Sequence, residues 1–199
     1  MGALKLLLAS APAGSDRHRA LMRACCTMLY AHYEGFCKFC WTLMLDSIQG
    51  QVLSRQDLVD PLARRSMAAV FREVRGDTSD SNLWNFATTT FSGLLKERAA
   101  FADEIDTESN LWPAVAKRIN VSIGIQCPVF EAHDAELRQL VGRRNEIAHG
   151  EKLEMADLAQ LQRFEHAAVM AMHDVAVAVV DCLDKRAYVR QAPLGASSA

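Results

Sequence analysis

The chain has 199 residues, of which 50% are apolar and 23% are charged, and its net charge at pH 7 is −2. This composition is that of an ordinary globular protein with enough apolar material for one domain, or at most two small ones. The slightly acidic balance excludes a protein whose whole surface binds a polyanion, but it leaves room for a local basic groove.

The first residues, 1–14, predict a flexible arm. The stretch from Leu4 to Ala9 is apolar but is interrupted by Lys5, and it is shorter than the apolar core of a signal peptide, about 7–15 residues. This arm is expected either to fray or to pair with the edge of a neighbour. No stretch of the chain approaches the roughly 20 apolar residues of a membrane span, so no membrane partner is expected.

A long first helix is predicted to begin at Ser15 or Asp16, either of which can cap it, and to run to Ile48, with Gly50 at its end. Steps of three and four residues predict one continuous apolar stripe along this helix. The stripe consists of Leu21, Cys25, Met28, His32, Phe36, Phe39 and Leu43.

The placement of the six cysteines predicts that they are reduced thiols and that the protein is cytoplasmic. Four of them lie in the first helix, where they act as small hydrophobic residues, whereas disulfide scaffolds are shorter and rich in loops. Cys37-x-x-Cys40 has no second cysteine pair and no nearby pair of histidines, and a zinc site needs about four ligands. We therefore expect no metal and no other cofactor.

The middle of the chain predicts shorter helices separated by loops. One helix is expected from Asp60, its cap, to about Arg75, with Pro61 in its first turn and Gly76 at its end. The expected elements that follow are a loop over 77–82, a short helix over 83–95, a helix over 111–119 and a loop with Gly124 and Pro128.

Two helices complete the chain, one over 132–149 that Gly150 ends and a long one over 155–188. The tail, 191–199, has the composition of a disordered segment. Two long helices that bracket shorter ones predict an all-α antiparallel bundle, formed as one domain over 15–190. The broad apolar stripes on the long helices also suggest a homodimer.

The end of the 132–149 helix carries the clearest chemistry. Arg144 and His149 are five positions apart, and Asn145 directly follows the arginine. Arginine is a permanent cation that holds phosphate oxygens, and histidine transfers protons near neutral pH. Such a pair suffices to cut RNA without a metal. The 2'-hydroxyl of RNA attacks the adjacent phosphate when one group takes its proton, another protonates the leaving oxygen and a cation stabilises the phosphorane.

Helix geometry indicates how these residues can act. Five steps rotate by about 140°, so Arg144 and His149 do not share one face, and a second copy across a two-fold axis can supply the missing partner. Asn145 and His149 are four positions apart and do share a face. The helix macrodipole favours the cationic form of His149, which suits proton transfer.

The segment from Arg144 to Gly150 resembles the signature of the HEPN superfamily of all-helical domains, an arginine followed by a polar residue and, a few positions on, a histidine. The first helix carries Tyr30-Ala31-His32-Tyr33-Glu34-Gly35-Phe36. This is similar to the Tyr-Ala-His-Trp-Glu-Gly-Phe stretch of a branch of HEPN nucleases from bacterial conflict systems, with Tyr33 in place of the tryptophan.

The resemblance implies a metal-independent endoribonuclease, either a toxin held by an antitoxin protein or an effector of phage defence. It also implies that two protomers bring their motifs together at a shared cleft, where RNA is the substrate. Arg144, Asn145 and His149 are the catalytic residues that the spacing and the resemblance together predict.

Three further residues are candidate auxiliary groups. Glu34 either orients the catalytic pair or forms an ordinary ion pair with Lys38. His32, on the apolar stripe, is either a hydrogen-bonded core or interface residue or a catalytic one. Arg143 either contacts phosphate beside Arg144 or faces solvent.

Two other interpretations remain open at this point. His149 can be a simple helix cap while Arg144 pairs with an acid such as Glu146 or Glu151. The chain can also be a non-catalytic HEPN module that binds RNA, a nucleotide or a partner protein, or a purely structural dimerisation module.

Overall fold

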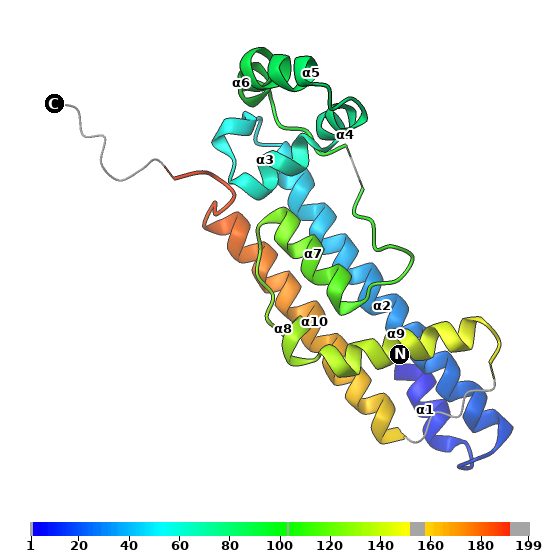
Figure 1. Ribbon diagram of the computed structural model, residues 1–199. Coiled ribbons are helices and arrows are strands. Elements are labelled where there is room, and N and C mark those ends of the chain that lie inside the picture. The colour runs from blue at the N-terminus through cyan, green and yellow to red at the C-terminus, as the bar shows by residue number, and fades with distance from the viewer. Residues whose placement is uncertain (1, 103, 152–157, 192–199) are drawn as a thin grey trace. The chain divides into compact units, whose positions relative to one another are not determined.

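The computed structural model describes residues 2–102, 104–151 and 158–191. Within these ranges every regular element is a helix, and β-pairing is limited to the isolated bridges Ser54–Arg98 and Leu58–Val189 (Figure 1). The predicted all-α fold is therefore confirmed. The elements are α1 Gly2–Ser10, α2 Asp16–Gln49, the 3-10 turn η1 Arg55–Asp57, α3 Asp60–Ser66, α4 Ala68–Gly76, α5 Asp80–Asn85, the π-helical turn η2 Phe86–Thr90, α6 Phe91–Lys96, α7 Pro113–Ile123, α8 Val129–Ala132, α9 Asp134–Ala148 and α10 Leu158–Asp184.

The chain divides into two compact units. The first contains residues 1–41, 105–119 and 127–178, and the second contains residues 42–104, 120–126 and 179–199. The predicted single domain over 15–190 stays a prediction, because two compact units can belong to one folding domain. Of the predicted disordered tail, only Gln191 lies in the described part of the chain.

The N-terminal segment is a packed helix and not the flexible arm that the sequence predicted. In α1 the side chain of Leu8 is buried, and Ala11 just after the helix is buried as well. Lys5 forms an ion pair with Glu165 of α10. Of the short apolar run, Leu8 is therefore part of the core of the first unit, whereas Leu6 and Leu7 are exposed.

Helix α2 has the bounds that the sequence predicted, but it buries a different face. The Ser15 hydroxyl accepts the backbone N–H of His18 at 3.1 Å, which caps the helix. Of the predicted stripe only Cys25 is buried, whereas Phe36, Phe39 and other members are exposed. The stripe was misplaced because apolar residues surround α2. The buried face consists of Met22, Cys25, Cys26, Leu29, Tyr30, Tyr33, Cys37, Cys40, Trp41, Met44, Leu45 and Ile48.

Three of the shorter helices differ from the prediction in their bounds. The single helix expected over 60–75 is two helices, α3 and α4, because Met67 leaves helical geometry with φ −105° and ψ 11°. The expected loop over 77–82 ends early, since α5 begins at Asp80. Helix α7 begins at Pro113, where a missing N–H costs nothing, and extends to Ile123.

The last two helices follow the prediction closely. Gly150, with φ +75°, directly follows the C-cap of α9, as expected for a glycine that ends a helix. The described part of α10 begins at Leu158, so the predicted start near residue 155 lies outside the described residues.

By length and composition alone, α10 is the one described helix that can cross a membrane, a test that core helices of soluble proteins also pass. The sequence did not predict a stretch of this kind.

All six cysteines are buried free thiols. Burial raises the pKa of Cys26 to about 11 and that of Cys127 to about 12. The thiols are thus protonated core residues, in agreement with their predicted role as small hydrophobic side chains.

Candidate active site

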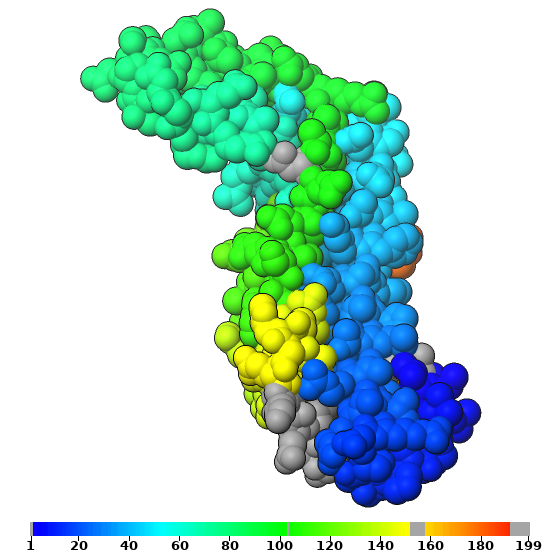
Figure 2. Space-filling model, turned by 90° about the vertical axis from the view of Figure 1, so that its right-hand side faces the viewer, coloured from blue at the N-terminus to red at the C-terminus, as the bar shows by residue number. Residues whose placement is uncertain are grey.

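The Arg/His motif occupies the last turns of α9 in the first unit. His149 is the C-cap residue, and its backbone N–H donates to the carbonyl of Asn145 at 2.9 Å. Arg23 of α2 reaches this helix end, where its guanidinium donates to the carbonyls of Glu151 at 2.8 Å and Ile147 at 3.4 Å. In Figure 2 the end of α9, in yellow, lies beside α2, in blue. Arg23 thereby links α2 to the end of α9 and to the residue that follows Gly150.

The guanidinium of Arg144 is held by three neutral groups. Its Nη1 donates to Oδ1 of Asn110 at 3.0 Å and to Oδ1 of Asn145 at 2.9 Å. Its Cζ lies over the ring of Tyr30, 4.7 Å from the centroid, in a cation–π contact. We call Tyr30, Asn110 and Asn145 the neutral cradle of Arg144.

The two segments that carry the family resemblance therefore meet in the folded chain. Tyr30 comes from the Tyr30–Phe36 stretch of α2, and Arg144 comes from the motif of α9. Tyr30 is buried and is fixed at its hydroxyl, which accepts the backbone N–H of Leu111 at 2.9 Å. Tyr33 donates to the carbonyl of the same Leu111 at 3.2 Å. These two bonds hold the segment that precedes α7 against α2 and so position Asn110.

Glu34 contacts the cradle through Tyr30. Its Oε1 accepts the hydroxyl of Thr107 at 2.7 Å, and a side-chain hydrogen bond links it to Tyr30. Burial raises the pKa of Tyr30 to about 12, and the Glu34 carboxylate adds to this rise. Tyr30 is therefore a neutral phenol at physiological pH. The hydrogen bond from Tyr30 to Glu34 holds the ring over which the Arg144 guanidinium lies.

Within the described residues, no carboxylate lies within ion-pair distance of Arg144. The neighbouring Arg143 is the residue that pairs with Glu146, at 3.1 Å. The alternative in which Arg144 pairs with Glu146 thus does not match the geometry. A guanidinium that is half-buried and bonded only to neutral acceptors keeps its full positive charge for an anion from outside the chain.

His149 and His32 are exposed, and neither imidazole forms a hydrogen bond within the described part of the chain. Asn145, which shares a helix face with His149, uses its amide oxygen on Arg144. The fold thus joins Arg144, Asn145 and Glu34 through shared contacts, whereas His149, His32 and Arg143 are not part of this network.

Sequence reasoning missed three residues of the site, namely Arg23, Thr107 and Asn110. Asn110 precedes Arg144 by 34 positions in an irregular segment, and no spacing rule connects the two. Arg23 was one of several arginines near the start of a long helix. The motif identified Asn145, and the position of Tyr30 inside the resembling stretch pointed toward the second cradle residue.

The helical fold and the Arg-Asn…His end of α9 define a HEPN domain. The model of the HEPN_MAE_28990-like HEPN family matches residues 1–188 of the chain, and the protein therefore belongs to this family. Membership indicates a ribonuclease-type or nucleotide-related function. Comparison with curated proteins and with solved structures gives no match.

Proposed function

We propose that the protein is a metal-independent endoribonuclease. The observation that carries this proposal is the neutral cradle, because it leaves a positive charge on a half-buried guanidinium that no carboxylate of the described residues neutralises. A simple helix cap or a packing arginine does not require such an arrangement. The ligand that such a free positive charge stabilises most is a phosphodiester, because its cleavage passes through a crowded phosphorane with two negative charges.

In the proposed reaction, the 2'-hydroxyl oxygen of the substrate bonds to the adjacent phosphorus while a base takes its proton. The bond from phosphorus to the 5'-oxygen then breaks, and an acid gives that oxygen a proton. His149 performs proton transfer, and Arg144 stabilises the pentacoordinate phosphorane. The products are a 2',3'-cyclic phosphate and a 5'-hydroxyl. Glu34 and Asn145 are positioning residues that keep Arg144 in place.

A single protomer offers one histidine at this helix end, whereas acid and base roles are best divided between two groups. We infer that the active form is a homodimer in which two copies of the motif share one cleft. An exposed apolar stripe on α2 supports this inference. Phe36 is 41% exposed, Phe39 is 61% exposed, and His32 lies on the same face. A Phe39→Glu variant is expected to be a monomer by light scattering, with a folded helical spectrum.

The decisive experiment is RNA cleavage by the purified full-length chain in the presence of a chelator. We expect 2',3'-cyclic phosphate ends with the wild type, and a loss of at least about 100-fold in rate with His149→Ala or Arg144→Ala. Two variants away from the motif serve as controls, namely His133→Ala at the N-cap of α9 and Arg138→Ala on α9. Unchanged cleavage by both motif variants would end the proposal, as would cleavage that stops when metal is removed.

The second candidate is a non-catalytic HEPN module that binds RNA, a nucleotide or a partner protein. The exposed position of His149, outside the Arg144 network, is the observation in its favour. Expression in a bacterial host separates the two candidates. Growth arrest that His149→Ala relieves supports a nuclease that acts as a toxin or defence effector in the cytoplasm, held by an antitoxin protein. Harmless expression of the wild type favours the binding module.

A further inference from the structure

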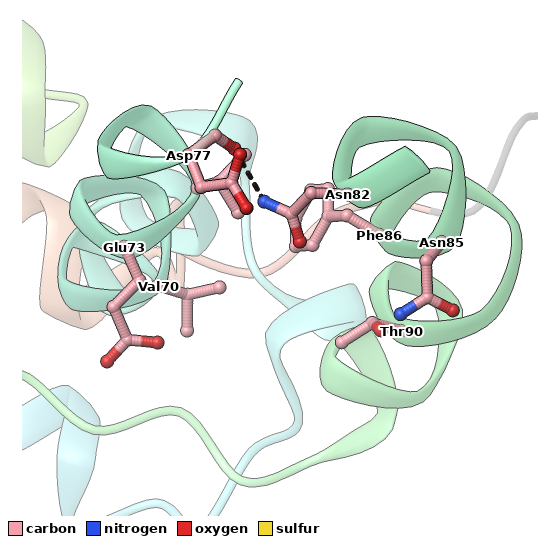
Figure 3. Close-up of a pocket in the computed structure, with 8 residues that line it drawn as sticks. Val70, Glu73, Asp77, Asn82, Asn85, Phe86 and Thr90 are labelled. Carbon is pink, nitrogen blue, oxygen red and sulfur yellow. Dashed lines mark hydrogen bonds between the residues drawn. The ribbon is translucent and has the colours of Figure 1, made fainter. Parts of the chain in front are cut away.

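An open pocket of about 330 Å³ lies between α4 and the α5–η2 segment of the second unit (Figure 3). Asn82 donates to the carbonyl of Asp77 at 2.6 Å, whereas Glu73 and Asn85 lie on opposite sides of the pocket. Because its polar side chains do not converge on one point, the pocket defines no ligand. Contacts that do converge on one functional residue lie in the first unit, around His149.

The chain around His149 is fixed locally by its own backbone. The N–H of Glu151 donates to the carbonyl of Glu146 at 3.0 Å, and the N–H of Gly150 donates to the carbonyl of Ile147 at 3.2 Å. With Gly150 at φ +75°, these two bonds form a Schellman motif, a common way to end a helix. The motif fixes the path of the chain from α9 through His149. It does not fix that path relative to any other helix.

Arg23 of α2 supplies this second connection. Its Nη1 donates to the carbonyl of Glu151 at 2.8 Å, and its Nη2 donates to the carbonyl of Ile147 at 3.4 Å. The two carbonyls lie two positions after and two positions before His149. The guanidinium therefore spans the residue that carries the imidazole and ties the chain on both sides of it to α2.

The same helix also contacts Arg144. Tyr30, whose ring centroid is 4.7 Å from Cζ of Arg144, follows Arg23 by seven positions. Seven steps of an α-helix make nearly two turns, so Arg23 and Tyr30 share a face of α2 and lie about 10 Å apart along its axis. Helix α2 thus contacts both residues of the motif, Arg144 through an aromatic ring and His149 through its backbone.

We propose that Arg23 is a positioning residue that keeps the backbone of His149 fixed relative to Arg144, an inference that rests on the proposed function for the role of His149. The imidazole forms no hydrogen bond within the described residues, so its place is set by the backbone that carries it. An acid or base must come within about 3 Å of the atom with which it exchanges a proton. A misplacement of about 1 Å can cost about 100-fold in rate.

A direct contact between Arg23 and a phosphate of the RNA is the alternative role. The terminal nitrogens of a guanidinium form the fork that binds a phosphate through two parallel hydrogen bonds. In Arg23 each of these nitrogens already donates to a backbone carbonyl. The geometry therefore favours the positioning role.

The first experiment compares single-turnover RNA cleavage by the wild type, Arg23→Gln and Arg19→Gln. We expect Arg23→Gln to lower the cleavage rate about 10- to 100-fold. Its affinity for an uncleavable RNA with a 2'-deoxy position, and the salt dependence of that affinity, should stay unchanged. Arg19 is the matched control, because it is an exposed arginine one turn earlier on α2 that pairs with Asp16, and Arg19→Gln should cleave like the wild type.

Two outcomes of this comparison overturn the inference. A weaker RNA affinity with a smaller salt dependence and an unchanged cleavage rate assigns Arg23 to a phosphate contact. A cleavage rate and an RNA affinity that both equal those of the wild type show that the link from Arg23 to the end of α9 does not affect the reaction.

The second experiment does not depend on cleavage. Relaxation of ¹⁵N in the full-length chain gives the backbone order parameter, which is about 0.85 for a rigid backbone and below about 0.6 for a flexible one. We expect His149 and Gly150 to be rigid in the wild type and in Arg19→Gln and flexible in Arg23→Gln, while Leu140 stays rigid in all three. Unchanged order parameters in Arg23→Gln overturn the inference. The expected change in a chain whose wild type does not cleave RNA removes the nuclease proposal alone.

Discussion

Replacing Asn110 with aspartate places a carboxylate where Arg144 now meets a neutral amide oxygen. The substitution keeps the shape of the side chain, and Oδ1 already lies 3.0 Å from Nη1. The variant therefore creates an ion pair inside the neutral cradle without a change in packing. If the free charge of Arg144 is what the cradle provides, this single change removes it.

The magnitude follows from the distance and the partial exposure of Arg144. Two unit charges near a protein surface attract by about 4 kcal/mol at 4 Å with an effective dielectric constant of about 20. Solvent screening reduces this value for a half-exposed pair, so about 1–3 kcal/mol is a reasonable range. A phosphate must compete with the new carboxylate by that amount, which corresponds to a loss of about 5- to 150-fold in affinity or in kcat/KM.

The assay compares kcat/KM for RNA cleavage, and the affinity for an uncleavable RNA with a 2'-deoxy position, among three variants. Asn110→Asp should show the full loss with unchanged or higher thermal stability. Asn110→Ser removes the amide but adds no charge, and it should lose no more than about tenfold. Gln139→Glu adds the same charge on the exposed face of α9 and should behave like the wild type.

The reasoning is refuted if Asn110→Asp cleaves and binds RNA like the wild type. It is also refuted if Asn110→Ser is impaired as much as Asn110→Asp, because the amide geometry and not the charge would then decide. A drop in the melting temperature of Asn110→Asp would indicate a damaged fold, and the RNA affinity at a temperature well below the transition would then be the deciding measurement.

Three further outcomes are expected. Leu137→Ala on the buried face of α9 should lower the free energy of unfolding by about 2–5 kcal/mol in a urea titration, because Leu137 is fully buried. The folded pKa of Tyr30 is about 12 and its unfolded value is 10.0, so its stabilising effect is complete below pH 10 and is lost as the pH rises from 10 through 12. The slope should be on the order of 1.4 kcal/mol per pH unit, and Tyr30→Phe should be less sensitive to alkali. Burial raises the pKa of Cys26 and Cys37, so iodoacetamide at pH 8 should modify these thiols slowly in the native protein and rapidly in urea, as mass spectrometry would record.

Much of the fold could be predicted from the sequence. The bounds of α2 and α9 followed from local signals, namely a serine cap at Ser15 and a glycine in left-handed geometry at Gly150. The buried face of α2 could not be predicted, since cysteine, methionine and aromatic residues surround that helix. A periodic pattern identifies a face only when the opposite face is polar.

The sequence by itself determined the helical class, the end of α9 and the family motif, because caps, glycines and motif spacing act over a few residues of chain. Tertiary structure alone decided what surrounds Arg144. Asn110 and Tyr30 reach it from distant parts of the chain, and Glu146 pairs with Arg143 instead. Whether the Arg144 charge is neutralised depends on side chains that come close to it only after the helices have packed. A local sequence pattern does not predict such long-range contacts.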